Sequence, residues 1–170
     1  MRVEKTRKVV LTAVLFAVAL VLSIVESMIP PVPIPVPGVK FGLSNIVVMY
    51  SLLLLGKSTA FTIAILKSMF AIITRGTVAG LLSFTGGIFS ILIMIVLMYI
   101  FKDSISYFIL SVFGAVFHNI GQFTAISLIY VGMNFWFYLP LLIILGFFAG
   151  IVTSSLLRFI LPALKGVGLK

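Results

Sequence analysis

The chain has 170 residues, of which 62% are hydrophobic and 9% are charged, and its mean hydropathy is +1.37. No water-soluble core of this size could bury so much apolar surface, so the composition indicates an integral membrane protein. The absence of cysteine excludes disulfides and thiolate metal sites. The formal charge of +9 gathers at the ends of apolar segments, which argues against a nucleic-acid-binding face.

The apolar runs are continuous rather than alternating with polar residues, which favours transmembrane helices over a β-barrel. We therefore expect an all-α, polytopic membrane protein, a single domain built as a bundle of six transmembrane helices. The first run is too long for the core of a signal peptide and lacks a small-residue cleavage site, so we interpret it as a retained span. The expected spans are 9–29, 41–55, 59–74, 81–101, 105–131 and 136–161.

Residues 30–40, between the first two spans, contain five of the seven prolines. Proline fixes its own φ and pushes the preceding residue to extended geometry, so this stretch cannot be helical. We expect a stiff, apolar outer loop that either covers a pocket or acts as a rigid connector. The spans 41–55 and 59–74 are short, which is typical of helices that line a cavity, although less tilted helices would look the same.

Basic residues predict the orientation. With the N-terminus in the cytoplasm and six crossings, inner segments hold nine lysines and arginines and outer segments hold two, Lys40 and Arg75. This bias predicts a multi-pass protein of the cytoplasmic membrane with both termini inside. The inner residues are Arg2, Lys5, Arg7, Lys8, Lys57, Lys102, Arg158, Lys165 and Lys170.

Lys67 lies inside the third span, where a lysine costs roughly 2.5–3.5 kcal/mol on insertion scales. Two helical turns are too far for its ammonium group to reach the interface easily, so the side chain should face the bundle interior. It could bind a ligand there. It could equally form a buried pair with Glu26, the only acid within a span, and the two roles are compatible.

His118, Asn119 and Gln122 lie in the middle of the fifth span. His118 and Gln122 are four residues apart and share a helix face. Three polar residues within five favour a polar pocket over interhelical hydrogen bonding alone, which remains the alternative. A single histidine without a nearby carboxylate or thiolate is a poor metal site, so we expect no metal and no cofactor.

Lys40 and Asn45 open the second span, just after the proline-rich loop, and Arg75 ends the third span on the same outer side. A helix N-terminus beside basic side chains suits an anionic or polar head group. The alternative is that Lys40 and Arg75 only anchor their spans at the interface. No catalytic arrangement is visible, because three acids, one of them in a span, cannot form the paired aspartate sites of magnesium-dependent diphosphate chemistry.

Four segments of the chain form a recognisable set, which consists of Pro37–Ile46, Arg75–Thr77, Ser83–Gly87 and Gly114–Gln122. Together they resemble the Gx transporter family, also called heptaprenyl diphosphate synthase component I. That family is in turn similar to the substrate-binding S components of energy-coupling factor (ECF) transporters. The resemblance implies six helices, an outer loop over the ligand, and contact with a coupling subunit through the Ala13 and Ala17 pair on the first span.

The leading hypothesis is a membrane-embedded substrate-binding subunit for uptake of a small vitamin-like or isoprenoid or quinone-precursor solute. Its partners would be an ECF-type transmembrane coupling subunit and its ATPases, since the chain has no nucleotide site. The substrate-binding residues would be Lys40, Asn45, Lys67, Arg75, His118, Asn119 and Gln122. The alternative is a non-transporting accessory subunit of polyprenyl diphosphate synthesis or of a membrane redox assembly. An intramembrane enzyme using His118 is a third hypothesis, and it lacks a partner acid.

Overall fold

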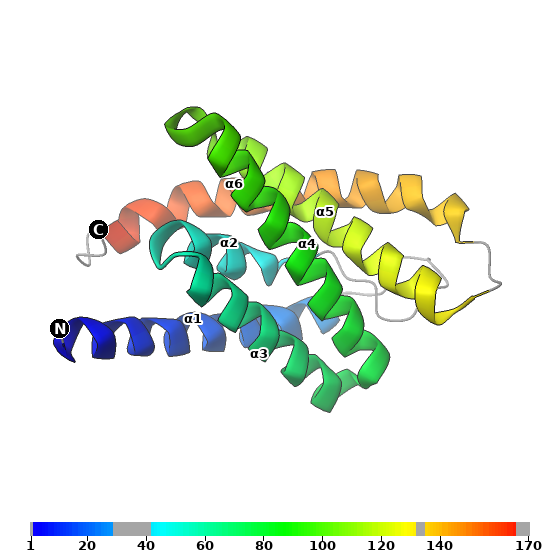
Figure 1. The fold of residues 1–170 in the computed structure, drawn as a ribbon, viewed down its shortest axis with the longest axis horizontal. Coiled ribbons are helices and arrows are strands. Elements are labelled where there is room, and N and C mark those ends of the chain that lie inside the picture. The colour runs from blue at the N-terminus through cyan, green and yellow to red at the C-terminus, as the bar shows by residue number, and fades with distance from the viewer. Residues whose placement is uncertain (1, 29–41, 132–134, 166–170) are drawn as a thin grey trace.

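The computed structural model describes residues 2–28, 42–131 and 135–165, and all regular secondary structure in them is helical. Six α-helices form one bundle, as predicted (Figure 1). Two single 3₁₀ turns accompany them, one after α4 and one before α6. The α-helices are α1 (Arg2–Met28), α2 (Asn45–Leu54), α3 (Lys57–Arg75), α4 (Thr77–Phe101), α5 (Tyr107–Ile129) and α6 (Leu139–Lys165).

Five of these helices are long and apolar enough to cross a membrane, and α2 is the shorter one. The chain is therefore a multi-pass membrane protein. The prediction for α2 needs correction, because the helix covers 45–54 rather than the expected 41–55. Gly42 has φ +84, a conformation that favours glycine, and a turn closed by Asn45 N donating to Gly42 O precedes the helix. Ten residues extend about 15 Å, half of a bilayer core of about 30 Å.

The other helices differ from the expected spans mainly at their ends. α1 begins at Arg2 instead of residue 9, because lysine and arginine are good helix formers and continue the helix beyond its apolar part. α4 begins at Thr77 instead of residue 81, because Gly76 alone joins it to α3. Gly76 makes this sharp reversal with φ +93, which a side chain would disfavour.

The short helix α2 lies at the centre of the bundle. It contacts each of the five long helices, and its residues from Asn45 to Leu52 are all buried. A helix that is apolar on all sides is stable only when other helices surround it. The main hydrophobic core therefore forms around α2, with α1, α3 and α4 contributing Ala19, Ile63 and Met94.

Helix α5 packs between α4 and α6, and small residues bring the three helices close together. A Cβ atom added to Gly121 of α5 would lie 2.7 Å from the Thr85 carbonyl oxygen of α4. A Cβ atom added to Gly150 of α6 would lie 2.5 Å from Val112 Cα of α5. These contacts are those of small-residue helix interfaces in membranes.

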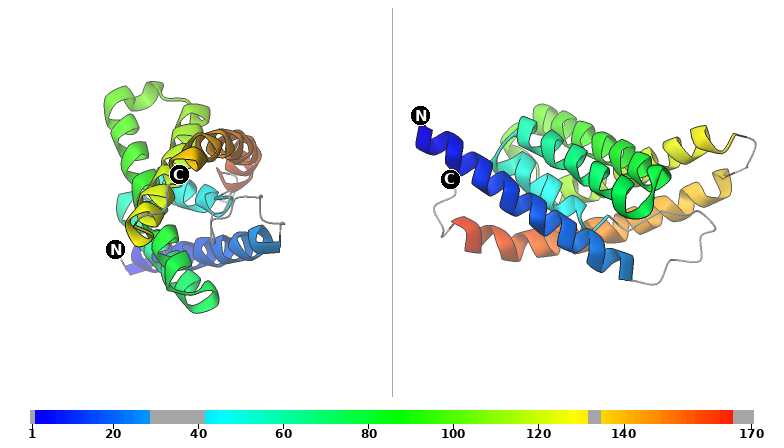
Figure 2. Two further views of the ribbon diagram at one scale, coloured as in Figure 1. Left: turned by 90° about the vertical axis from the view of Figure 1, so that its right-hand side faces the viewer. Right: turned by 90° about the horizontal axis from the view of Figure 1, so that it is seen from below.

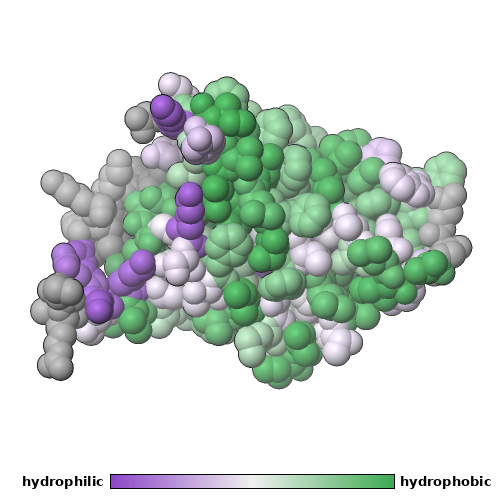
Figure 3. All heavy atoms as spheres, in the orientation of Figure 1, coloured by the Kyte–Doolittle hydropathy of each residue, from purple (hydrophilic) through white to green (hydrophobic). Residues whose placement is uncertain are grey.

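Successive helices alternate in direction, so the first turn of α1 and the last turn of α6 lie at the same end of the bundle (Figures 1 and 2). The α2–α3 connection, just before Lys57, and the α4–α5 connection, which contains Lys102, lie at that end too. Figure 3 shows the most hydrophilic residues at this end and mostly apolar residues, with some of intermediate hydropathy, over the remainder of the visible face. We call it the basic end.

Candidate functional site

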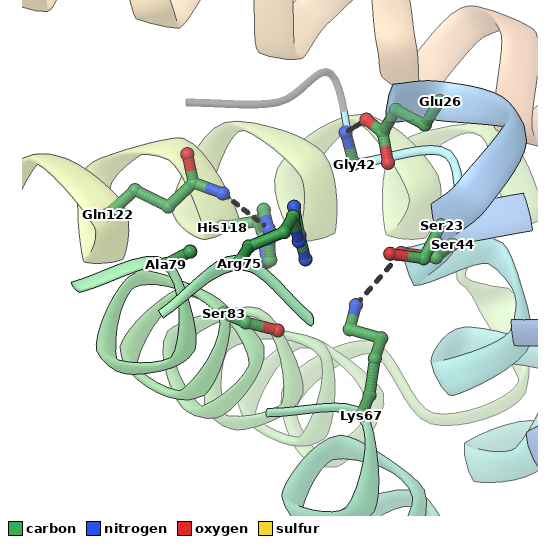
Figure 4. Close-up of a pocket in the computed structure, with 10 residues that line it drawn as sticks. All are labelled: Ser23, Glu26, Gly42, Ser44, Lys67, Arg75, Ala79, Ser83, His118 and Gln122. Atoms are coloured by element: carbon green, nitrogen blue, oxygen red, sulfur yellow. Dashed lines mark hydrogen bonds between the residues drawn. The ribbon is translucent and has the colours of Figure 1, made fainter. Parts of the chain in front are cut away.

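A polar cavity lies beside the N-terminus of α2, enclosed by α1, α3, α4 and α5 (Figure 4). About 20 Å³ is open to the centre of a water-sized sphere, which is room for one or two water molecules. Seven of the ten lining residues have a charged, hydroxyl or amide side chain, and His118 adds an imidazole ring. The lining residues are Ser23, Glu26, Gly42, Ser44, Lys67, Arg75, Ala79, Ser83, His118 and Gln122.

Lys67 reaches the cavity from the middle of α3. Its side chain is 3% exposed, and Nζ donates a hydrogen bond of 3.1 Å to Ser44 Oγ. Lys67 lies on the buried face of α3, together with Ala60, Ala64 and Ala71. Because these neighbours are small, α1 and α2 can pack close to α3 and enclose the ammonium group. Lys67 therefore faces the bundle interior, as predicted, at the depth where α2 begins.

Glu26 enters the cavity from the opposite wall. It is 4% exposed, and its Oε1 accepts hydrogen bonds from the backbone N–H groups of Gly42 and Leu43, the latter at 3.3 Å. The carboxylate thus holds the turn that leads into α2. On α1, only Ala19, Ser23 and Glu26 are buried among the described side chains. Their three- and four-residue spacing marks one helix face, which is the sequence signal for Ser23 and Glu26 as cavity residues.

Arg75 is the last residue of α3 and lies two turns beyond Lys67. It is partly exposed, and its side chain is among those that line the cavity (Figure 4). The negative charge of Glu26 attracts it. Arg75 and Lys67 therefore bring two cations from one helix to the same space, facing one carboxylate from α1.

His118 and Gln122 form the wall contributed by α5. They lie one turn apart, with 2.9 Å between His118 Nε2 and Gln122 Nε2, so the ring nitrogen accepts from the amide. Gln122 Oε1 is buried and has no hydrogen-bond partner among the described residues, whereas His118 Nδ1 faces the Gly86 backbone. A buried polar atom without a partner costs about 1–3 kcal/mol. Gln122 therefore has unused capacity to bind water or a ligand.

Gly86 of α4 is what lets the His118 ring fit. A Cβ atom added to Gly86 would lie 2.7 Å from His118 Cε1 and 2.9 Å from the His118 carbonyl oxygen. Real side chains do not approach that closely, so glycine is required for the present ring position. The sequence motif around Gly86 thus has a packing role at the site.

Asn45 and Asn119, both predicted to bind substrate, lie outside this cavity. Asn45 borders a smaller space toward α6 and donates from Nδ2 to Ser90 Oγ at 2.7 Å. Asn119 Nδ2 donates to the Leu142 carbonyl oxygen of α6 at 2.8 Å, which is an interhelical contact. Lys40 and the proline-rich loop lie outside the described residues.

Ala13 and Ala17 are exposed on α1, away from the cavity. The cavity brings two cationic side chains and one carboxylate together. Nowhere in the part of the chain that the structure describes do three or more His, Cys, Asp or Glu residues meet as metal ligands. Two cations beside one carboxylate would repel a metal ion.

The chain matches the protein-family model described as heptaprenyl diphosphate synthase component I over residues 15–160. The chain belongs to this family. The match covers α2 to α5 entirely and includes every residue that lines the cavity. No curated protein and no solved structure matches the chain. Members of the heptaprenyl diphosphate synthase component I family are named for one component of a synthase, and the described residues of this one form a membrane-embedded helical bundle.

Proposed function

We propose that this chain is a membrane-embedded substrate-binding subunit for uptake of a small vitamin-like or isoprenoid or quinone-precursor solute. The single observation that carries the proposal is the buried cavity where Lys67, Arg75, His118 and Gln122 converge. Ionisable residues inside membrane spans are costly and usually serve binding or transport. A half-length helix whose N-terminus opens at mid-membrane is also typical of transporter binding sites.

The ligand would enter from the end of the bundle that carries Arg75, opposite the basic end. Lys67, Arg75, His118 and Gln122 would line the site, and Lys40 would join them from the outer side. The basic end would face the cytoplasm, which puts both termini inside the cytoplasmic membrane. Uptake would depend on an ATP-driven coupling module, docked on the exposed Ala13 and Ala17 surface of α1.

The family description favours a second candidate, an accessory subunit that assembles with the other component of a polyprenyl diphosphate synthase. In that role the chain would hold a synthase at the membrane without moving a solute. Catalysis would then belong to the partner.

Co-purification separates the two candidates. We expect the tagged chain from native membranes to retain a transmembrane coupling subunit and ATPases, and cells with all partners to accumulate solute in an ATP-dependent manner. Replacing Ala13 and Ala17 with leucine should abolish co-purification of the coupling subunit and ATPases, because the larger side chains block close helix contact. Val14→Leu is the matched control, since Val14 is 54% exposed on the same helix. Retention of a prenyl synthase without ATPases would refute the uptake role and support the second candidate.

A further inference from the structure

The cavity has an excess of positive charge that the chain cannot neutralise. Lys67 and Arg75 contribute two positive charges, and Glu26 contributes one negative charge. The whole chain has three acids, and the other two are Glu4, in the first turn of α1, and Asp103, in the turn after α4. Both elements lie at the basic end, away from Arg75 (Figure 1).

The sequence excludes a further internal counter-charge from the nearest connection. Residues 29–41 contain Lys40 and no acid, so this segment can add only positive charge. A neutral His118 adds none, and a protonated one would increase the excess. With Glu26 ionised, the site therefore carries at least one positive charge more than it can balance from its own side chains.

The lining groups are those that recognise oxyanions. The Arg75 guanidinium presents a planar fork of N–H donors, which binds carboxylate and phosphate oxygens in pairs. Lys67 supplies a second cation, and Ser44 and Ser83 supply hydroxyl donors (Figure 4). The positive end of the α2 dipole lies at the same place, because α2 begins at Asn45.

Resting on the solute-binding role proposed above, we infer that the ligand of this cavity carries a carboxylate or phosphate group, bound between Lys67 and Arg75. Glu26 acts as a fixed internal counter-charge, which sets the preference at one net negative charge. The present space holds only one or two waters. We expect binding to draw Lys67 Nζ away from Ser44 Oγ. A solute or an anionic lipid head group could supply the same oxyanion.

The test uses the full-length chain in nanodiscs of phosphatidylcholine. The thermal unfolding midpoint is followed while acetate or inorganic phosphate replaces chloride at constant ionic strength. We expect both oxyanions to raise the midpoint. Lys67→Gln and Arg75→Gln should each weaken the apparent affinity roughly 10- to 100-fold, since each removes a charge-assisted hydrogen bond. Lys57→Gln, at the exposed start of α3, is the matched control and should leave the affinity unchanged.

For Glu26→Gln we expect the opposite effect, which is stronger oxyanion binding. It keeps an oxygen for the Gly42 N–H group but raises the positive excess from one charge to two. The apparent affinity for phosphate should therefore rise at least about threefold. If Glu26 served only to hold the α2 turn, this variant would lower the midpoint without strengthening phosphate binding, and that result would overturn its assigned role.

A second set of nanodiscs identifies the source of the anion. If a lipid supplies it, phosphatidylglycerol alone should raise the wild-type midpoint relative to phosphatidylcholine, and Lys67→Gln should lose this gain. If a solute supplies it, only the added oxyanions should act. The inference would be overturned if the oxyanions changed the unfolding midpoint equally in wild type, Lys67→Gln and Lys57→Gln in both membranes. Should Lys67→Gln fail to fold, Arg75→Gln decides, because Arg75 lies at the helix end and is partly exposed.

This inference and the uptake role fail in different ways. A Lys67-dependent oxyanion response without ATP-dependent accumulation would refute the uptake role and retain the anion site. Accumulation of a solute by a chain that shows no Lys67-dependent response would refute the anion site and retain the uptake role.

Discussion

Neighbouring residues on α5 have different roles because successive side chains point about 100° apart. His118 faces the polar cavity, whereas Asn119 faces α6 and donates to the Leu142 carbonyl oxygen. In a bilayer, such an interhelical hydrogen bond is worth about 0.6–2 kcal/mol. Asn119 therefore belongs to the packing of α5 on α6.

Replacing Asn119 with alanine should lower stability by about 1 kcal/mol, because the buried Leu142 carbonyl oxygen loses its donor. Unfolding by sodium dodecyl sulfate in bicelles measures the change. Thr124→Ala is the control, because the Thr124 hydroxyl donates to Ile120 O within the same helix. Its removal should lower the stability less. A loss for Asn119→Ala no larger than for Thr124→Ala would contradict the packing role.

At this scale the sequence predicted which polar residues are buried better than it predicted what they contact. Lys67, His118 and Gln122 stand out because they interrupt apolar spans, and the structure brings them into one cavity. The Gly42 N–H group donates to Glu26, which lies 16 residues earlier in the sequence. Such contacts depend on how α1 and α2 pack, which no local pattern encodes.

Among the helices, the crossing of α4 and α5 is the contact that most constrains the cavity wall. The backbones approach at Gly121, where an added Cβ atom would meet the Thr85 carbonyl oxygen and Gly86 Cα. Neither atom can move without moving its helix. The α4–α5 spacing therefore fixes the place of His118 relative to Ser83.

Gly121→Ala should destabilise the protein by about 1–3 kcal/mol, because the added methyl group forces the two backbones apart. Gly87→Ala is the control at the neighbouring α3–α4 contact, where the new Cβ atom would lie 3.4 Å from Ala64 Cβ, close to ordinary contact. Detergent unfolding of both variants gives the comparison. Equal stability of the two would show that the helices can separate freely at this crossing.

Helix boundaries show where sequence reasoning loses accuracy. Five spans were predicted to within a few residues at most ends, because apolar length and glycine or proline breaks are local features. The sequence predicts that the second span starts at residue 41, directly after the proline-rich segment 30–40. The Gly42 turn interrupts it, and the positive φ there is stabilised by the contact with Glu26, a long-range effect.

For the whole molecule, composition alone indicated a membrane bundle, since no other environment accommodates so much exposed apolar surface. The alternation of the helices then follows from short connections, and it collects the basic turns at one end. Which end faces the cytoplasm is a prediction from charge, and it determines the side from which the cavity is reached.

Because the chain has no cysteine, single cysteines report this orientation without background. Ser58 lies at the basic end and Thr77 at the opposite end, and both are exposed. In intact cells, a membrane-impermeant maleimide should label Thr77→Cys and should reach Ser58→Cys only after permeabilisation. Labelling of Ser58→Cys in intact cells would show that the orientation is opposite to the predicted one. The Arg75 end of the cavity would then face the cytoplasm, and solute capture from outside the cell would be impossible through this route.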